Sequence, residues 1–314
     1  MIPRRTTAFP SIQNPILRLP DNLRDPSVFP AGGGYQLYYT RYRIGDWNAG
    51  GNWYVARCFT RDFVHFTDHE DVTGQNFASP GDVVLWHGRW IMPFQSYPER
   101  PQQLYFVESS DAKTWSLPRA FLSAALELPW NTDRRAIDPS FVVDGDKLHC
   151  FFVGSDGLGT PRRANLLGHA VTTDPELKEW QILSPEKPLM GRDRAADGVE
   201  NVVVYRAGGR WLMLLSEGMH EQHLALAESQ DLVTWFPLGP VEIAGQSWCD
   251  FRYGAPFVWC EFGTYFMILM GEETPDHRSS LGFLTSADGI RWELMPERAD
   301  SANFLSQPET TASS

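Results

Sequence analysis

One pattern recurs five times along the chain of 314 residues and limits the folds it can adopt. Each unit contains a short β-type run, a glycine turn, two further runs separated by a loop, an aspartate turn and a closing aromatic residue. The turn glycines are Gly33, Gly88, Gly145, Gly208 and Gly263, and the closing aromatics are Phe66, Trp115, Trp180, Trp235 and Trp292. Glycine between two β-type runs is typical of a hairpin. The pattern therefore predicts four antiparallel strands in each unit.

Five units of this kind predict an all-β fold, a five-bladed β-propeller in a single domain. The domain is expected to cover residues 1–298, with blades that start near residues 25, 80, 138, 200 and 255. A polar C-terminal tail, residues 299–314, is expected to fray. Because the fifth unit contains all four of its own strands, we expect blade 5 to close on blade 1 without a strand from the N-terminus.

Acidic residues stand at the start of three of the five units. Asp25, Asp138 and Glu200 each precede the first strand, whereas the other two units have Ser79 and Ala255 there. The first strand of each blade lines the central channel of a propeller, so the three carboxylates are expected at one mouth of that channel. A cluster of like charges is costly to bury unless it is used. We therefore interpret these acids as catalytic and the aspartates of the later turns as structural.

The second strand of each blade returns to the same mouth, and its last residues are expected to contact a ligand. Arginines beside the blade starts and a tryptophan in a loop above the mouth are further candidates. The predicted substrate-binding residues are Arg24, Trp47, Gln95, Ser155, Glu217 and Arg252. Glu217 is also a second candidate for a catalytic acid.

Composition excludes several classes of partner. With a net charge of −12, the chain lacks the basic surface that nucleic acids and anionic membranes require. No run approaches the roughly 18 apolar residues of a membrane helix, and we expect a cytoplasmic protein, or a secreted one if a signal peptide was removed. We expect no cofactor and no metal, since His220 and His223 have no evident third ligand. Nothing in the sequence indicates the oligomeric state.

The motifs Arg24-Asp25-Pro26 and Ile137-Asp138-Pro139-Ser140, followed by Glu200 at the start of blade 4, resemble those of the family 43 glycoside hydrolases. The resemblance extends over all five units and implies a glycosidase acting on an oligosaccharide or glycoside. It implies an inverting enzyme for an α-L-arabinofuranosyl or β-xylosyl unit. Long loops near the mouth, at residues 41–52, 97–103 and 157–165, are expected to wall a pocket and therefore favour exo action on a terminal unit. By this resemblance, Asp25 is the general base, Glu200 is the general acid, and Asp138 orients the acid and favours its protonated form.

Three alternatives stay open on the sequence. A retaining β-fructosidase-like propeller would use Asp25 as a nucleophile, with the two carboxyl groups about 5–5.5 Å apart. A glycoside phosphorylase would replace the base by a phosphate held by arginines such as Arg134 and Arg135. A carbohydrate-binding propeller without activity would not depend on the ionisation of Asp25.

Overall fold

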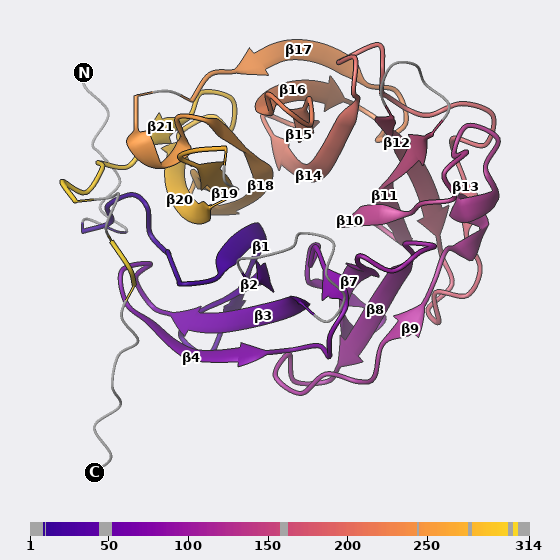
Figure 1. The fold of residues 1–314 in the computed structure, drawn as a ribbon. Helices are drawn as coiled ribbons and strands as arrows, with labels where there is room; N and C mark the ends of the chain where they lie inside the picture. The colour runs from indigo at the N-terminus through magenta and orange to yellow at the C-terminus, as the bar shows by residue number, and fades with distance from the viewer. Residues whose placement is uncertain are drawn as a thin grey trace.

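The computed structural model describes residue 9 and residues 11–43, 52–157, 163–243, 245–275, 278–300 and 304–306. Five antiparallel sheets lie in a ring around one axis (Figure 1). The first strands of neighbouring blades contact one another at the centre of the ring. This confirms the predicted five-bladed propeller. Among the described residues, no helix is long and apolar enough to cross a membrane.

The chain builds the blades in sequence order, from the centre outwards. Blade 1 contains β1 (Asn22–Ala31), β2 (Gly34–Tyr42), β3 (Trp53–Thr60) and β4 (Phe66–Asp71). Blade 3 contains β10 (Ile137–Asp144), β11 (Lys147–Asp156), β12 (Ala164–Thr172) and β13 (Gln181–Ile182). Blade 4 contains β14 (Val199–Ala207), β15 (Arg210–Glu217), β16 (His223–Ser229) and β17 (Phe236–Val241). Blade 5 contains β18 (Arg252–Glu261), β19 (Thr264–Glu272), β20 (Ser279–Ser286) and β21 (Glu293–Leu294).

Blade 2 differs from the others in its inner strand. Two short pieces, β5 (Phe77–Ala78) and β6 (Val84–Trp86), both pair with β7 (Arg89–Ser96). The strands β8 (Leu104–Ser109) and β9 (Arg119–Ala120) complete the sheet. Two short 3₁₀ helices, η1 (Ser123–Glu127) and η2 (Ser247–Cys249), lie in connections between blades. The interruption falls at Ser79-Pro80-Gly81, where proline removes a backbone donor from the ladder.

The turn residues behave as their types predict. The five hairpin glycines have positive φ angles, which residues with a Cβ adopt only at a cost. The carboxylate of the later turn in each blade accepts hydrogen bonds from backbone N–H groups two or more residues ahead. These aspartates are Asp62, Asp111, Asp174, Asp231 and Asp288. They lie away from the central channel and have a structural role.

Blade 5 closes on blade 1 with four strands of its own, as predicted, and the N-terminal segment adds a backbone bridge that was not expected. Blade 5 has its own four strands, but β21 has only two residues and covers part of β20. Leu17 pairs with Leu281 further along the same edge, with Ile16 N–H donating to the Leu281 carbonyl at 2.8 Å. The short outer strand would otherwise leave backbone groups of β20 unpaired, which is costly in a packed fold.

Part of the C-terminal tail is also held in place. The Ser306 N–H donates to the Arg18 carbonyl at 2.8 Å, so the tail does not fray at this point. Arg298 lies over the ring of Phe304 with 4.0 Å between the guanidinium carbon and the ring centroid. The tail therefore packs against the N-terminal segment that closes the ring.

Candidate active site

Each blade begins with one residue in the left-handed backbone conformation. These residues are Asp25, Ser79, Asp138, Asn201 and Ala255, with φ angles of 49°, 51°, 50°, 48° and 48°. In four of the blades a bulge interrupts the pairing of the inner strand there, as between Arg24 and Ser27. A bulge with a left-handed residue re-aims a side chain that would otherwise stay in the pleat. The repeated bulge therefore turns one side chain per blade toward the mouth.

The structure corrects the register of Glu200. The sequence analysis placed Glu200 at the same blade position as Asp25 and Asp138, but Asn201 occupies that position. Glu200 instead corresponds to Arg24 in blade 1 and to Ile137 in blade 3. In the other four blades a proline follows this position, but Asn201 is followed by valine. The missing proline hid the shift of one residue.

A cavity of about 300 Å³ opens at this mouth. Six of the residues predicted for the site line it: Arg24, Asp25, Gln95, Asp138, Glu200 and Arg252. The residues that the sequence analysis did not assign to the site include Trp53, Tyr97, Arg135, Arg163 and Asn201. The volume lies at the lower end of the range for small-molecule pockets, roughly 300–1,000 Å³.

Two predicted residues lie outside this lining, and one cannot be placed. The Ser155 hydroxyl is buried and donates to Asp133 Oδ2 at 2.7 Å. Glu217 accepts from Arg194 Nε at 2.6 Å and lies 3.3 Å from His223 Nε2. Trp47 falls outside the described residues. Of the two glutamates considered, Glu200 lines the cavity, whereas Glu217 is paired outside the described lining.

Asp25 is held by neutral donors on both oxygens. Its Oδ2 accepts from the hydroxyls of Thr40 at 2.7 Å and Ser79 at 3.0 Å, and its Oδ1 accepts from Asn201 Nδ2 at 3.2 Å. Burial raises the pKa of Asp25, while Arg24 and the two hydroxyl groups oppose that rise. These contacts stabilise the ionised form and fix the orientation of the carboxylate.

Asp138 is 7% exposed and sits between the other two acids. Burial raises its pKa to about 8, and the charges of Glu200 and Asp25 add to the rise, against the opposing effect of Arg135. Its backbone N–H donates to Gln95 Oε1 at 2.5 Å, which fixes the backbone there. The cluster therefore keeps a proton at neutral pH.

Two amide side chains hold Glu200. Asn165 Nδ2 donates to Glu200 Oε2 at 2.7 Å, and Gln222 Nε2 donates to Oε1 at 2.8 Å. Both amides come from the third strand of a blade or the loop before it, outside the repeated motif. The sequence analysis missed them because no spacing rule links them to Glu200.

The buried carboxylate of Glu272 binds Arg252 and also acts electrostatically on Arg24. Arg252 binds Glu272 through Nε at 2.7 Å and Nη2 at 2.9 Å and donates through Nη1 to the Met219 carbonyl at 3.0 Å. Burial alone would lower the pKa of Arg24, but Glu272 and other nearby acidic groups raise it. The Arg24 guanidinium therefore stays charged at the cavity wall.

No group of three or more His, Cys, Asp or Glu side chains that could hold a metal ion occurs in the described part of the chain.

Comparison with solved structures finds the same architecture in proteins titled as glycoside hydrolases. A glycoside hydrolase matches with a TM-score of 0.71 and 14% identity, over 94% of this chain and 93% of that one. A thermostable family-43 glycoside hydrolase matches with a TM-score of 0.64 and 14% identity, over 96% and 98%. The α-L-arabinanase of Cellvibrio cellulosa complexed with arabinohexaose matches with a TM-score of 0.64 and 14% identity, over 91% and 99%.

This chain has the fold of the family 43 propellers. No protein-family model and no curated protein sequence matches it. The predicted likeness to furanosidase-type propellers is thus confirmed for the fold.

Replacing Asp138 tests the electrostatics of this propeller site directly. Asp138→Asn is expected to raise the free energy of unfolding at pH 8 by on the order of 3 kcal/mol. The folded carboxyl keeps its proton up to about pH 8, whereas the unfolded one loses it near 3.8. The unfolded state of the parent is therefore favoured increasingly as the pH rises from about 4 to 8, and asparagine removes this effect. Urea unfolding of both proteins at pH 5 and pH 8 measures it; an equal gain at both values would contradict the assignment.

Gly198 precedes Glu200 in the chain and packs against the backbone of Asn165, whose side chain binds Glu200. Its φ is +89°, and a Cβ there would lie 1.8 Å from the Asn165 carbonyl oxygen. Gly198→Ala is expected to cost about 3 kcal/mol of stability or more, since neither backbone can yield cheaply.

Gly88→Ala is the matched control for this substitution. Gly88 has a φ of +80° but nothing within 4 Å of a built Cβ, so only the backbone cost of about 1 kcal/mol applies. Thermal unfolding of both variants compares the two costs. Equal losses in the two variants would refute the contact with Asn165.

Proposed function

We propose that this protein is a glycoside hydrolase that removes a terminal pentose-type sugar, α-L-arabinofuranosyl or β-xylosyl, by an inverting mechanism. The observation that carries the proposal is the convergence of Asp25, Asp138 and Glu200 on one cavity at the mouth of the propeller. Acid/base hydrolysis needs one ionised and one protonated carboxyl at the same pH. The donors around Asp25 are consistent with an ionised base, and the raised pKa of Asp138 is consistent with a proton held in the cluster of acids.

In this proposal Asp25 accepts a proton from a water molecule as the water oxygen forms a bond to the anomeric carbon. Glu200 donates its proton to the glycosidic oxygen as the carbon–oxygen bond breaks. Asn165 and Gln222 keep the Glu200 carboxyl oriented through both of its oxygens. Asp138, whose pKa the nearby charges of Glu200 and Asp25 help to raise, holds a proton in the same cluster of acids. Each step uses a side chain that already lines or contacts the cavity.

The size of the cavity supports action at a chain end. About 300 Å³ suits one or two sugar rings rather than a long oligosaccharide. Trp53, which stacks on Tyr42 with 4.2 Å between ring centroids, and Tyr97 supply aromatic wall beside the polar groups. Flat apolar faces of this kind favour contact with the C–H face of a sugar.

Turnover of a panel of aryl α-L-arabinofuranosides, β-xylosides and hexosides tests the proposed function. We expect release of the phenol from at least one pentoside, and no release by the double variant Asp25→Asn/Glu200→Gln. Binding of sugars without turnover of any glycoside, natural oligosaccharides included, would instead assign the propeller to carbohydrate binding.

A further inference from the structure

The cavity carries more positive charge than its catalytic acids require. Its lining includes Arg24, Arg135, Arg163 and Arg252, on a chain with a net charge of −12. Arg252 pairs with Glu272, which also raises the pKa of Arg24. Arg135 and Arg163 lie on the other wall and have no such buried partner among the described residues. A positive site on an acidic protein attracts an anionic ligand in preference to other surfaces.

Arg135 is 6% exposed, and its side chain donates hydrogen bonds to two neutral amides. Its Nε donates to Gln102 Oε1 at 2.5 Å and its Nη1 to Asn165 Oδ1 at 2.8 Å. Within the described ranges no carboxylate lies within 4.0 Å of its guanidinium nitrogens. Burial and the charge of Arg163 both lower the pKa of Arg135, against the opposing effect of the more distant Asp138 and Glu200 carboxylates. Burying a cation beside amides and a second cation is costly unless an anion completes the site.

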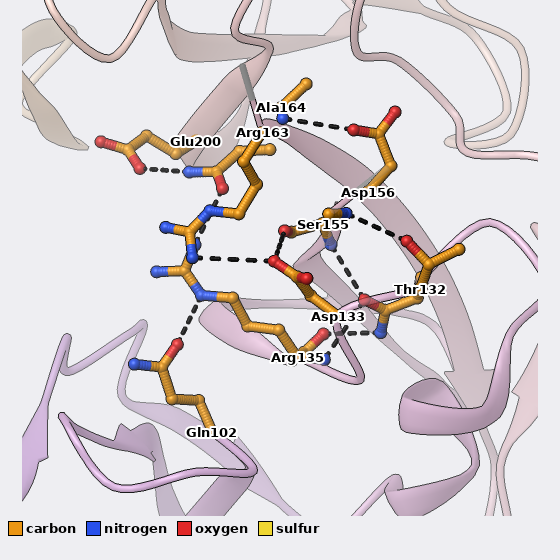
Figure 2. Close-up of polar contacts among 12 residues, drawn as sticks. Gln102, Thr132, Asp133, Arg135, Ser155, Asp156, Arg163, Ala164 and Glu200 are labelled. Atoms are coloured by element: carbon orange, nitrogen blue, oxygen red, sulfur yellow. Dashed lines mark hydrogen bonds and ion pairs between the residues drawn. The ribbon is translucent and has the colours of Figure 1, made fainter. Parts of the chain in front are cut away.

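Arg163 is the outer member of the pair, with a side chain 33% exposed. Its Nη1 lies 3.7 Å from Asp133 Oδ2, which also accepts the Ser155 hydroxyl at 2.7 Å. Figure 2 shows the two guanidinium groups next to each other, on the side of the cavity where Glu200 lies. Two adjacent planar guanidinium groups match the two oxygens of a carboxylate.

We propose that Arg135 and Arg163 bind a carboxylate of the substrate, so that the glycoside contains a uronic acid. The inference rests on the proposed function and adds the class of substrate. Asn165 bonds both Arg135 and Glu200, which places the pair beside the acid that protonates the leaving oxygen. The uronic acid is therefore the sugar on the leaving-group side of the bond that breaks. The pentose-type unit occupies the part of the cavity between Asp25 and Arg252.

Binding of free sugars tests the subsite without relying on turnover. Galacturonate and glucuronate are titrated against the protein by NMR, and their methyl esters, in which a methyl group replaces the negative charge, serve as the neutral ligands. We expect the free acids to bind at least about tenfold more tightly than the esters, and Arg163→Gln to remove about 10- to 100-fold of that affinity. Arg135→Gln should do the same, and Arg163→Lys should retain part of it.

Arg210→Gln is the matched control, since Arg210 pairs with Glu228 at the hairpin end of β15, away from the mouth. Esters that bind as tightly as the acids, or an Arg163→Gln variant with unchanged affinity, would overturn the inference. Because Arg163 is partly exposed, its variant tests the subsite even if Arg135→Gln does not fold.

Two further measurements separate the inference from the proposed function. Uronate binding that depends on both arginines, in a protein that cleaves no glycoside, would preserve the subsite and refute the hydrolase. Turnover that requires inorganic phosphate and yields a sugar 1-phosphate would mean that Arg135 and Arg163 bind phosphate. That result would overturn the carboxylate subsite. Hydrolysis in phosphate-free buffer, with lower KM for uronate-linked glycosides than for their methyl esters, supports both proposals.

Discussion

Asp25→Asn is expected to lower kcat on any glycoside cleaved by the parent by about 10²–10⁴-fold, with a smaller change in KM. Asparagine keeps the shape of the side chain and can still contact Thr40 and Ser79, but it cannot take a proton from water. Steady-state rates of the two purified proteins on the same aryl glycoside give the ratio.

Asp111→Asn is the control for this loss. Asp111 is exposed, and its carboxylate caps the turn of blade 2 through the N–H groups of Lys113 and Thr114. Its replacement removes one acid far from the cavity and should leave kcat unchanged. A kcat for Asp25→Asn equal to that of Asp111→Asn would remove Asp25 from the mechanism.

Glu200→Gln is expected to affect substrates according to their leaving group. A substrate with a poor leaving group needs the proton from Glu200, so kcat/KM on an alkyl glycoside or disaccharide should fall by about 10²–10⁴-fold. A dinitrophenyl glycoside needs little protonation and should lose far less. Rates on a series of leaving groups give the dependence.

Glu217→Gln controls for the second glutamate considered from the sequence. It pairs with Arg194 and His223 outside the cavity lining, so its replacement should leave the leaving-group dependence of the parent unchanged. A steep dependence in Glu217→Gln and none in Glu200→Gln would exchange the two roles.

The blades could be predicted from the sequence because each one repeats local rules. Glycines that adopt positive φ and aspartates that cap turns stand at recurring positions, so five copies reinforce one another. The closure of the ring was predicted less well. It depends on how far the two-residue strand β21 covers β20, and nothing in the repeat specifies the pairing of Leu17 with Leu281.

The acids of the site were found because they stand at blade starts, but their surroundings were not. Asn165 stands at the start of β12 and Arg163 directly before that strand, and Arg135 comes from the connection before β10. These connections follow no period, and tertiary packing alone brings them to Glu200. The one-residue shift at Glu200 was missed because Asn201 lacks the proline that follows this position in the other four blades.

The anomeric form of the first product tests the central claim most directly. ¹H NMR recorded within minutes of adding enzyme to a glycoside that it cleaves shows which anomer appears before mutarotation. An inverting pair, with Asp25 activating water and Glu200 protonating the leaving oxygen, predicts the anomer opposite to that of the substrate. A first product with the anomeric configuration of the substrate would contradict the account and make Asp25 a nucleophile.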